Sequence, residues 1–284
     1  MNENKNFILA PYLKGVGQIM LQDNAWTGLF FLVAIFLESY IVGLTAVLAV
    51  VTGTLTAKLL KYPVEHINAG LYGFSATLVG VAMVTFFKHT PVIWMAIIAG
   101  SVLAAMLQHV FIIRKFPGFT FPFIAITWVL YYCFAHIYKL EAMPPPPEES
   151  NNFVITSHGF GEIIFQASIS SGILFFIGVF IANPVAALYG LAAAVISAAL
   201  AFYIHEPVAP IAEGLFSFNA VLCAITFGGT RKVDGLYVLA AILLALVIEV
   251  IMIKYNCSPY LTIPFVAACW IIVIIKKMLP KSLL

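Results

Sequence analysis

Long apolar stretches without a charged side chain constrain this chain more than any other feature. Residues 91–113 and 184–204 contain no Asp, Glu, Lys or Arg. Each stretch is as long as the ~20 residues that a helix needs to cross a bilayer. Across the chain 63% of residues are hydrophobic and 9% are charged, whereas soluble domains carry roughly 25% charged residues. The sequence therefore predicts an all-α integral membrane protein whose main solvent is lipid.

Glycine, proline and charged residues divide the chain into ten predicted membrane spans. A polar connector over 141–156 contains four consecutive prolines and is expected to be extended. It separates a first half, residues 1–140, from a second half, residues 157–284. The spans are predicted at residues 26–40, 41–60, 70–87, 91–113, 121–138, 169–182, 184–204, 214–228, 235–253 and 262–279.

The positive charges support this division. With ten spans, Lys88, Lys139 and Lys254 fall on one side of the membrane and the other eleven of the 14 Lys and Arg residues fall on the opposite side. Cytoplasmic loops are enriched in Lys and Arg, so we expect a multi-pass plasma membrane protein with both termini in the cytoplasm. The first apolar run is too short for a signal peptide, which favours a bacterial inner membrane.

Charge and cysteine usage argue against several other classes of partner. The net charge is +2 and the chain has no basic tract, so nucleic acid is not an expected partner. The four cysteines are scattered without a CxxC spacing, so no metal cluster, disulfide framework or cofactor is predicted.

Several landmarks occur twice in the same order. The segment 70–78 matches the segment 214–222, and Gln18 matches Glu162, each at a separation of 144 positions. A Thr-x-Pro-Phe motif occurs at residues 120–123 and again 142 positions later. Five spans per half is an odd number, so the two halves are predicted to be inverted repeats, as in many transport proteins whose solute site lies near the midplane.

Two polar segments, residues 14–24 and 157–166, precede the first span of each half and are too short to cross the membrane. Irregular backbone at membrane depth must be buried in protein or line a water-filled path. We interpret both as re-entrant half-helices whose open ends present carbonyl oxygens, with Gln18 and Glu162 in equivalent places. The alternative is that both segments lie in surface loops. Glu162 is the sharpest candidate, because a carboxylate at membrane depth is costly.

The remaining candidates lie at the starts of spans. Thr120 and Thr262 precede the proline of a first helical turn, where threonine can cap the helix or direct its hydroxyl into a cavity. In the repeated segment, Phe74 and Leu78 are four residues apart and share one helical face, as do Phe218 and Leu222. An aromatic residue and a leucine on a buried helix usually only pack against their neighbours. The presence of the pair in both halves favours two apolar walls that face each other.

Together these landmarks resemble the urea transporter family over nearly the whole chain. The resemblance rests on Gly17-Gln18-Ile19, on Gly-Leu-x-x-Phe-x-x-x-Leu in both halves and on Thr-x-Pro-Phe in both halves. It implies a homotrimer with one pore per protomer, each pore a narrow slot walled by phenylalanine and leucine. Leu21 stands at the position that matches Phe165. The implied pore residues are Gln18, Leu21, Phe74, Leu78 and Thr120 in the first half and Glu162, Phe165, Phe218, Leu222 and Thr262 in the second.

Urea as the permeating solute fits these side chains. Its N–H groups can donate to Glu162 and Gln18, its carbonyl can accept from threonine hydroxyls, and its flat shape suits phenylalanine walls. Two alternatives remain: a channel for another small neutral solute (short amides, ammonia or water), and an ion-coupled secondary transporter. A membrane-embedded enzyme is disfavoured because HExxH, GxSxG and paired-carboxylate motifs are absent from the sequence.

Overall fold

The computed structural model describes residues 8–144, 155–166 and 168–278, and the chain folds into two units, Met1–Pro144 and Pro145–Leu284. The described residues are helical apart from turns, loops and one isolated β-bridge, between Phe87 and Ala142. Most of the predicted proline-rich connector lies outside the described residues. Its first part, residues 141–143, hydrogen-bonds to the backbone of residues 86–88 at the end of a helix.

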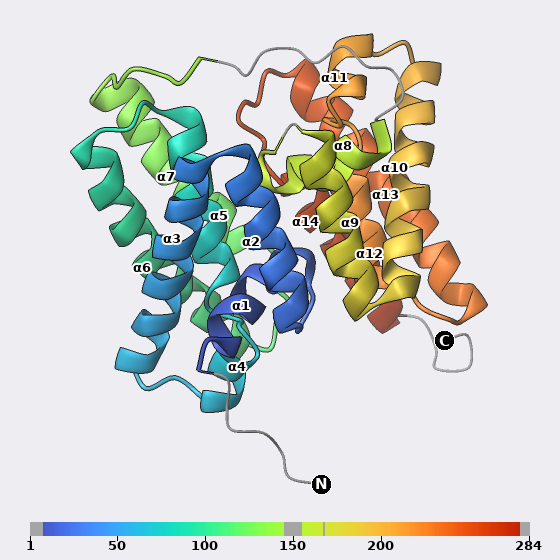
Figure 1. Cartoon of the computed structure of the whole chain (residues 1–284). Helices are drawn as coiled ribbons and strands as arrows, with labels where there is room; N and C mark the ends of the chain where they lie inside the picture. Colours follow the sequence, from blue (N-terminus) through green and yellow to red (C-terminus); the bar gives the residue numbers. More distant parts are fainter. Residues whose placement is uncertain (1–7, 145–154, 167, 279–284) are drawn as a thin grey trace, which may run out of the picture. The chain divides into compact units, whose positions relative to one another are not determined.

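The first unit contains seven α-helices with a short 3-10 turn after the first and a π turn after the last (Figure 1). In chain order they are α1 Ala10–Gly17, η1 Gln18–Met20, α2 Ala25–Glu38, α3 Tyr40–Leu59, α4 Val64–Asn68, α5 Phe74–Phe86, α6 Pro91–Ile113, α7 Phe121–Tyr132 and η2 Cys133–Ile137.

The described residues of the second unit follow the same order. They form α8 Ile155–Gly161, η3 Glu162–Ile164, α9 Ile169–Ala182, α10 Pro184–Tyr203, α11 Val208–Ala212, α12 Phe218–Phe227, α13 Lys232–Lys254 and α14 Ile263–Met278. The lengths agree closely: α2 and α9 have 14 residues, α3 and α10 have 20, and α6 and α13 have 23.

Each of the ten predicted spans contains a helix, and four helices in the described ranges are long and apolar enough to cross a membrane alone: α3, α6, α10 and α13. The number becomes six if each bent pair at the start of a unit is one span. The helices α5, α7 with η2, and α12 are apolar but shorter. The chain is therefore a multi-pass membrane protein, while the count of ten spans stays a prediction.

Two spans begin later than predicted. Their starts were predicted at residues 70 and 214, whereas α5 begins at Phe74 and α12 at Phe218. Gly70 and Gly214 have φ values of 77° and 82°. This left-handed conformation suits glycine and turns the chain before the helix can form.

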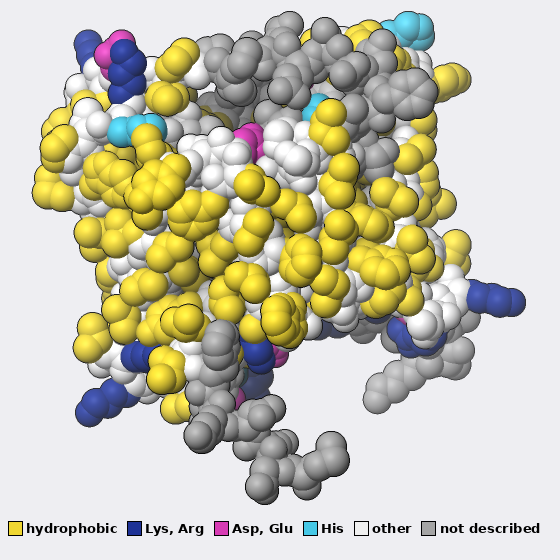
Figure 2. Space-filling model, viewed as in Figure 1, with side chains coloured by type: hydrophobic (Ala, Val, Ile, Leu, Met, Phe, Trp, Pro, Cys, Tyr) yellow, Lys and Arg dark blue, Asp and Glu magenta, His cyan; other side chains and the backbone are white. Residues whose placement is uncertain are grey.

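The helix α10 places large and small residues on opposite faces. Its large exposed side chains include Leu188, Leu191, Val195, Ile196 and Phe202. The buried positions of α10 are small: Ala186, Ala187, Gly190, Ala193, Ala194, Ser197, Ala198 and Ala201. Small residues allow close helix packing within a membrane. Large hydrophobic side chains dominate the visible surface in Figure 2, as a lipid-facing surface requires.

The first helices of each unit cross in backbone contact. The α1–η1 segment and α2 are bent by 75°, and the matching pair in the second unit by 88°. A Cβ atom on Gly28 of α2 would collide with the carbonyl oxygen of Leu13, and one on Gly172 of α9 would collide with that of Ser157. Glycine at these two positions is therefore required by the close approach, because the obstacle is backbone and cannot rotate away.

We expect Gly28→Ala to destabilise the protein by at least about 1–3 kcal/mol, since overpacking against fixed backbone forces the helices apart. The measurement is the melting temperature of the purified protein in detergent. Gly235→Ala in α13 is the matched control, because a Cβ there finds its nearest atom, the Tyr189 hydroxyl oxygen, at 3.2 Å. Equal melting temperatures for the two variants would contradict the close α1–α2 contact.

Candidate functional site

The first predicted half-helix is α1 with η1, and it ends at a left-handed residue. Leu21 has φ 58° and its N–H donates to the Gln18 carbonyl at 3.0 Å. The next N–H, of Gln22, donates to the Gly17 carbonyl at 3.1 Å. The Gln18 side chain donates from Nε2 to the Ala69 carbonyl at 2.9 Å. This bond fixes Gln18 between the end of the first half-helix and the loop before α5.

The second predicted half-helix, α8 with η3, ends in the same way. Phe165 has φ 57°, its N–H donates to the Glu162 carbonyl at 3.1 Å, and the Gln166 N–H donates to the Gly161 carbonyl at 3.1 Å. Glu162 is partly exposed and interacts electrostatically with Tyr260. Gln18 and Glu162 therefore hold the same place in their respective units, as do Leu21 and Phe165.

A buried glutamine after each break was missed by the sequence analysis. Nε2 of Gln22 donates to the Met20 carbonyl at 2.8 Å, and Nε2 of Gln166 donates to the Ile164 and Phe165 carbonyls, both at 3.0 Å. The prediction that the half-helices present open carbonyl ends was therefore wrong for these oxygens, because a side-chain amide already binds them. The 144-position separation of the two glutamines was the signal that could have revealed them.

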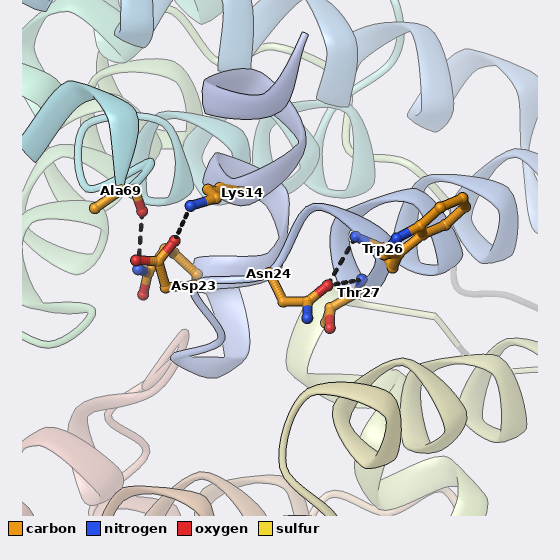
Figure 3. Close-up of polar contacts among 7 residues, drawn as sticks. Lys14, Asp23, Asn24, Trp26, Thr27 and Ala69 are labelled. Carbon is orange, nitrogen blue, oxygen red and sulfur yellow. Dashed lines mark hydrogen bonds and ion pairs between the residues drawn. The ribbon is translucent and has the colours of Figure 1, made fainter. Parts of the chain in front are cut away.

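A capped helix leads away from the first break (Figure 3). Oδ1 of Asn24 accepts from the N–H of Trp26 at 2.8 Å and of Thr27 at 3.2 Å. The preceding residue, Asp23, pairs with Lys14 of α1 at 2.7 Å. These contacts satisfy the first N–H groups of α2 and tie its start to α1.

The predicted wall residues are buried on helices that pack against the breaks. Phe74 and Leu78 lie on α5, which packs against η1 and α7. Phe218 and Leu222 lie on α12, which packs against η3 and α14. Within each unit, the elements that carry the predicted residues therefore converge.

Thr120 and Thr262 are buried immediately before α7 and α14, and their carbonyls accept the first helical bonds, from Ile124 and Val266, at 3.1 Å. The predicted side-chain cap was wrong for Thr120, whose hydroxyl makes no capping bond to α7. Its backbone, with φ −89° and ψ 6°, is not in the extended conformation typical of a capping residue.

A second polar group missed by the prediction lies behind the wall of the second unit. Asn219, next to Phe218, donates from Nδ2 to Oε1 of Glu249 at 2.8 Å, and its Oδ1 accepts from the Phe265 N–H at 3.2 Å. The two partners lie 30 and 46 positions away. No local sequence pattern indicates such contacts.

Comparison with known proteins identifies the family. The family model described as urea transporter matches residues 9–277. Urea transporter 1 of Rattus norvegicus is 24% identical over 247 residues, and those of Mus musculus and Ovis aries are 27% and 24% identical over 237 residues. Each comparison covers 76% of this chain and 62% of the relative, so the chain spans less than two thirds of the length of these relatives. Because the family match extends over almost all of the helices described above, this chain belongs to the urea transporter family.

Proposed function

We propose that this protein conducts urea passively across a membrane, through a narrow slot lined by phenylalanine and leucine. The family match over residues 9–277 carries this proposal. Gln18 corresponds to Glu162, and Leu21 to Phe165, in breaks with the same local backbone geometry, and this correspondence supports the proposal. The same element order in the two units favours two inverted repeats of five spanning helices each. We further propose a homotrimer in a bacterial inner membrane with one slot per protomer.

The proposed acceptors for urea are few and specific. The Glu162 carboxyl can accept urea N–H groups. The Gln18 side chain can accept them through Oε1, because its Nε2 already donates to the Ala69 carbonyl. Glutamine amides occupy the carbonyls of Met20 and Ile164, which therefore have only a second lone pair to offer. Sparse acceptors bind a solute weakly, and conduction needs binding weak enough for release.

The proposed walls explain selection against ions. Phe74, Leu78, Phe218 and Leu222 supply apolar surface that matches a flat neutral molecule, and Thr120 and Thr262 supply hydroxyl donors for its carbonyl. A bare ion in such a slot loses its hydration without an equivalent partner, which costs many kcal/mol. Urea keeps most of its hydrogen bonds, so the slot is selective without tight binding.

The first test is urea flux into proteoliposomes without any ion gradient. We expect rapid passive equilibration by the wild type. Glu162→Gln and Phe74→Ala should each reduce the rate about tenfold or more, because the first replaces the carboxyl acceptor with an amide and the second opens the wall. The exposed Leu239→Ala of α13 is the matched control and should conduct as the wild type does.

Two results would contradict the proposal. Wild-type flux no faster than in protein-free liposomes would exclude passive urea conduction and leave another neutral solute or an ion-coupled transporter. Urea flux that appears only when a proton or sodium gradient is imposed would favour the ion-coupled transporter.

The proposed topology is testable with a native cysteine. Cys257 is exposed in the loop between α13 and α14, close to Lys254, and this loop is predicted to face away from the cytoplasm. A membrane-impermeant maleimide added to intact spheroplasts should label Cys257. In a background with Cys133→Ser and Cys257→Ser, Thr230→Cys, between α12 and α13, should be labelled only after lysis. The reverse pattern would overturn the proposed orientation.

A further inference from the structure

A buried carboxyl on α13 has no role in the slot described so far. Glu249 is 1% exposed, and Oε1 accepts from Asn219. The carboxyl also interacts with the Tyr260 hydroxyl, although Oε2 has no well-formed hydrogen bond within the described part of the chain. A carboxyl at this depth is costly to keep, so its contacts indicate what it does.

Asn219 connects this carboxyl to the start of α14. The Phe265 N–H lies in the first turn of α14, where the helix itself supplies no acceptor. A backbone N–H can only donate, so the Asn219 oxygen must face Phe265 and its NH₂ group must face Glu249. By accepting from the NH₂ group, Glu249 therefore supports the amide orientation that holds the start of α14. The neighbouring Thr262 is held in place with the start of that helix.

Tyr260 connects the same carboxyl to the other predicted slot residues of this unit. Its ring stacks on Phe218 with the centroids 6.3 Å apart and the planes at 18°. Its hydroxyl interacts with Glu249, and it lies close enough to Glu162 for an electrostatic interaction. Tyr260 thus stacks on the predicted wall residue Phe218 and adjoins the predicted acceptor Glu162.

The first unit lacks this arrangement. The positions that match Asn219 and Tyr260 are Ser75 and Gly118. Oγ of Ser75 is buried and has no hydrogen-bond partner among the described residues. Within the described part of the chain, Ser75 therefore makes no link of the kind that Asn219 makes between α12 and α14.

We propose that Glu249 is a positioning residue for urea conduction, which acts through Asn219 and Tyr260 to fix Phe218 and Thr262. This inference rests on the proposed function. Glu249 itself does not contact the solute. Its loss is expected to change the width of the slot on the side of the second unit, and so the discrimination between urea and a larger analogue.

The experiment compares urea and N-methylurea flux in proteoliposomes. Glu249→Leu removes both polar contacts and should lower urea flux about tenfold while changing the urea to N-methylurea ratio. Glu249→Gln keeps an oxygen for Asn219 and should restore most of the flux and the wild-type ratio. Tyr260→Phe keeps the ring on Phe218 but removes the hydroxyl, and should change the ratio in the same direction as Glu249→Leu.

General destabilisation is separated by a matched control on the same helix. Leu246 is buried on α13 in an apolar cluster with Phe216 and Ile211. Leu246→Ala should lower the melting temperature about as much as a typical cavity does, without changing the flux ratio. A change in the ratio for Leu246→Ala as large as that for Glu249→Leu would overturn the positioning role.

The packing of α12 on α14 can be monitored directly. Sγ of Cys223 and Sγ of Cys269 lie 4.0 Å apart, one turn beyond Asn219 and Phe265. In a background with Cys133→Ser and Cys257→Ser, oxidation by copper–phenanthroline should join the two thiols in the wild type and in Glu249→Gln. Glu249→Leu should lower the yield if the two helices separate, and an unchanged yield restricts the effect to the side chains.

The outcomes separate the proposed urea conduction from the positioning role of Glu249. Absence of urea flux in the wild type overturns the proposed function. Wild-type flux together with an unchanged ratio in Tyr260→Phe and in Glu249→Leu overturns the positioning role alone. If Glu249→Leu does not fold, Tyr260→Phe decides the question, because it removes a single hydroxyl.

Discussion

The structure depends on satisfying the backbone where a helix breaks at the start of each unit. Lipid offers no hydrogen bonds, so irregular backbone survives at membrane depth only if protein groups replace water. At Leu21 and Phe165 the chain turns through a left-handed residue, and the following glutamine binds the exposed carbonyls with its own amide. Packing of α1 against α3 and α5 then shields the first break, and packing of α8 against α10 and α12 shields the second.

This solution determines what the break can offer to a solute. Had the last carbonyls been free, they would form a strong row of acceptors next to Gln18 and Glu162. Under the proposed function, binding of the Met20 and Ile164 carbonyls by glutamine amides leaves the Glu162 carboxyl and Oε1 of Gln18 as the proposed acceptors. In that proposal the contacts that stabilise the break also keep solute binding weak, which favours rapid passage over tight recognition.

The sequence predicted the helices well because each rests on its own apolar run. The position of the breaks was also predictable, since residues 14–24 and 157–166 are polar and repeated. Contacts that need two distant elements were not predictable, as with Asn219, whose partners lie on α13 and α14. The capping role of Thr120 failed for a different reason: its own backbone, with φ −89° and ψ 6°, is not in the extended conformation of a capping residue, and the residue type alone does not indicate this.

The two units hold matching helices in place by different chemistry. In the first, the Tyr72 hydroxyl bonds Nδ1 of His109 at 2.9 Å, which ties the loop before α5 to α6. The matching positions in the second unit are Phe216 and Ile253, which pack in an apolar cluster. There the polar contact joins Asn219, on α12 itself, to Glu249 on α13. Both arrangements fix the helix that carries the wall residues, so what the units share is the helix position and not the contact that secures it. Because the tie at Asn219 and Glu249 also adjoins the predicted acceptor Glu162 through Tyr260, we propose that it acts on the proposed slot more directly than the tie at Tyr72 and His109 does.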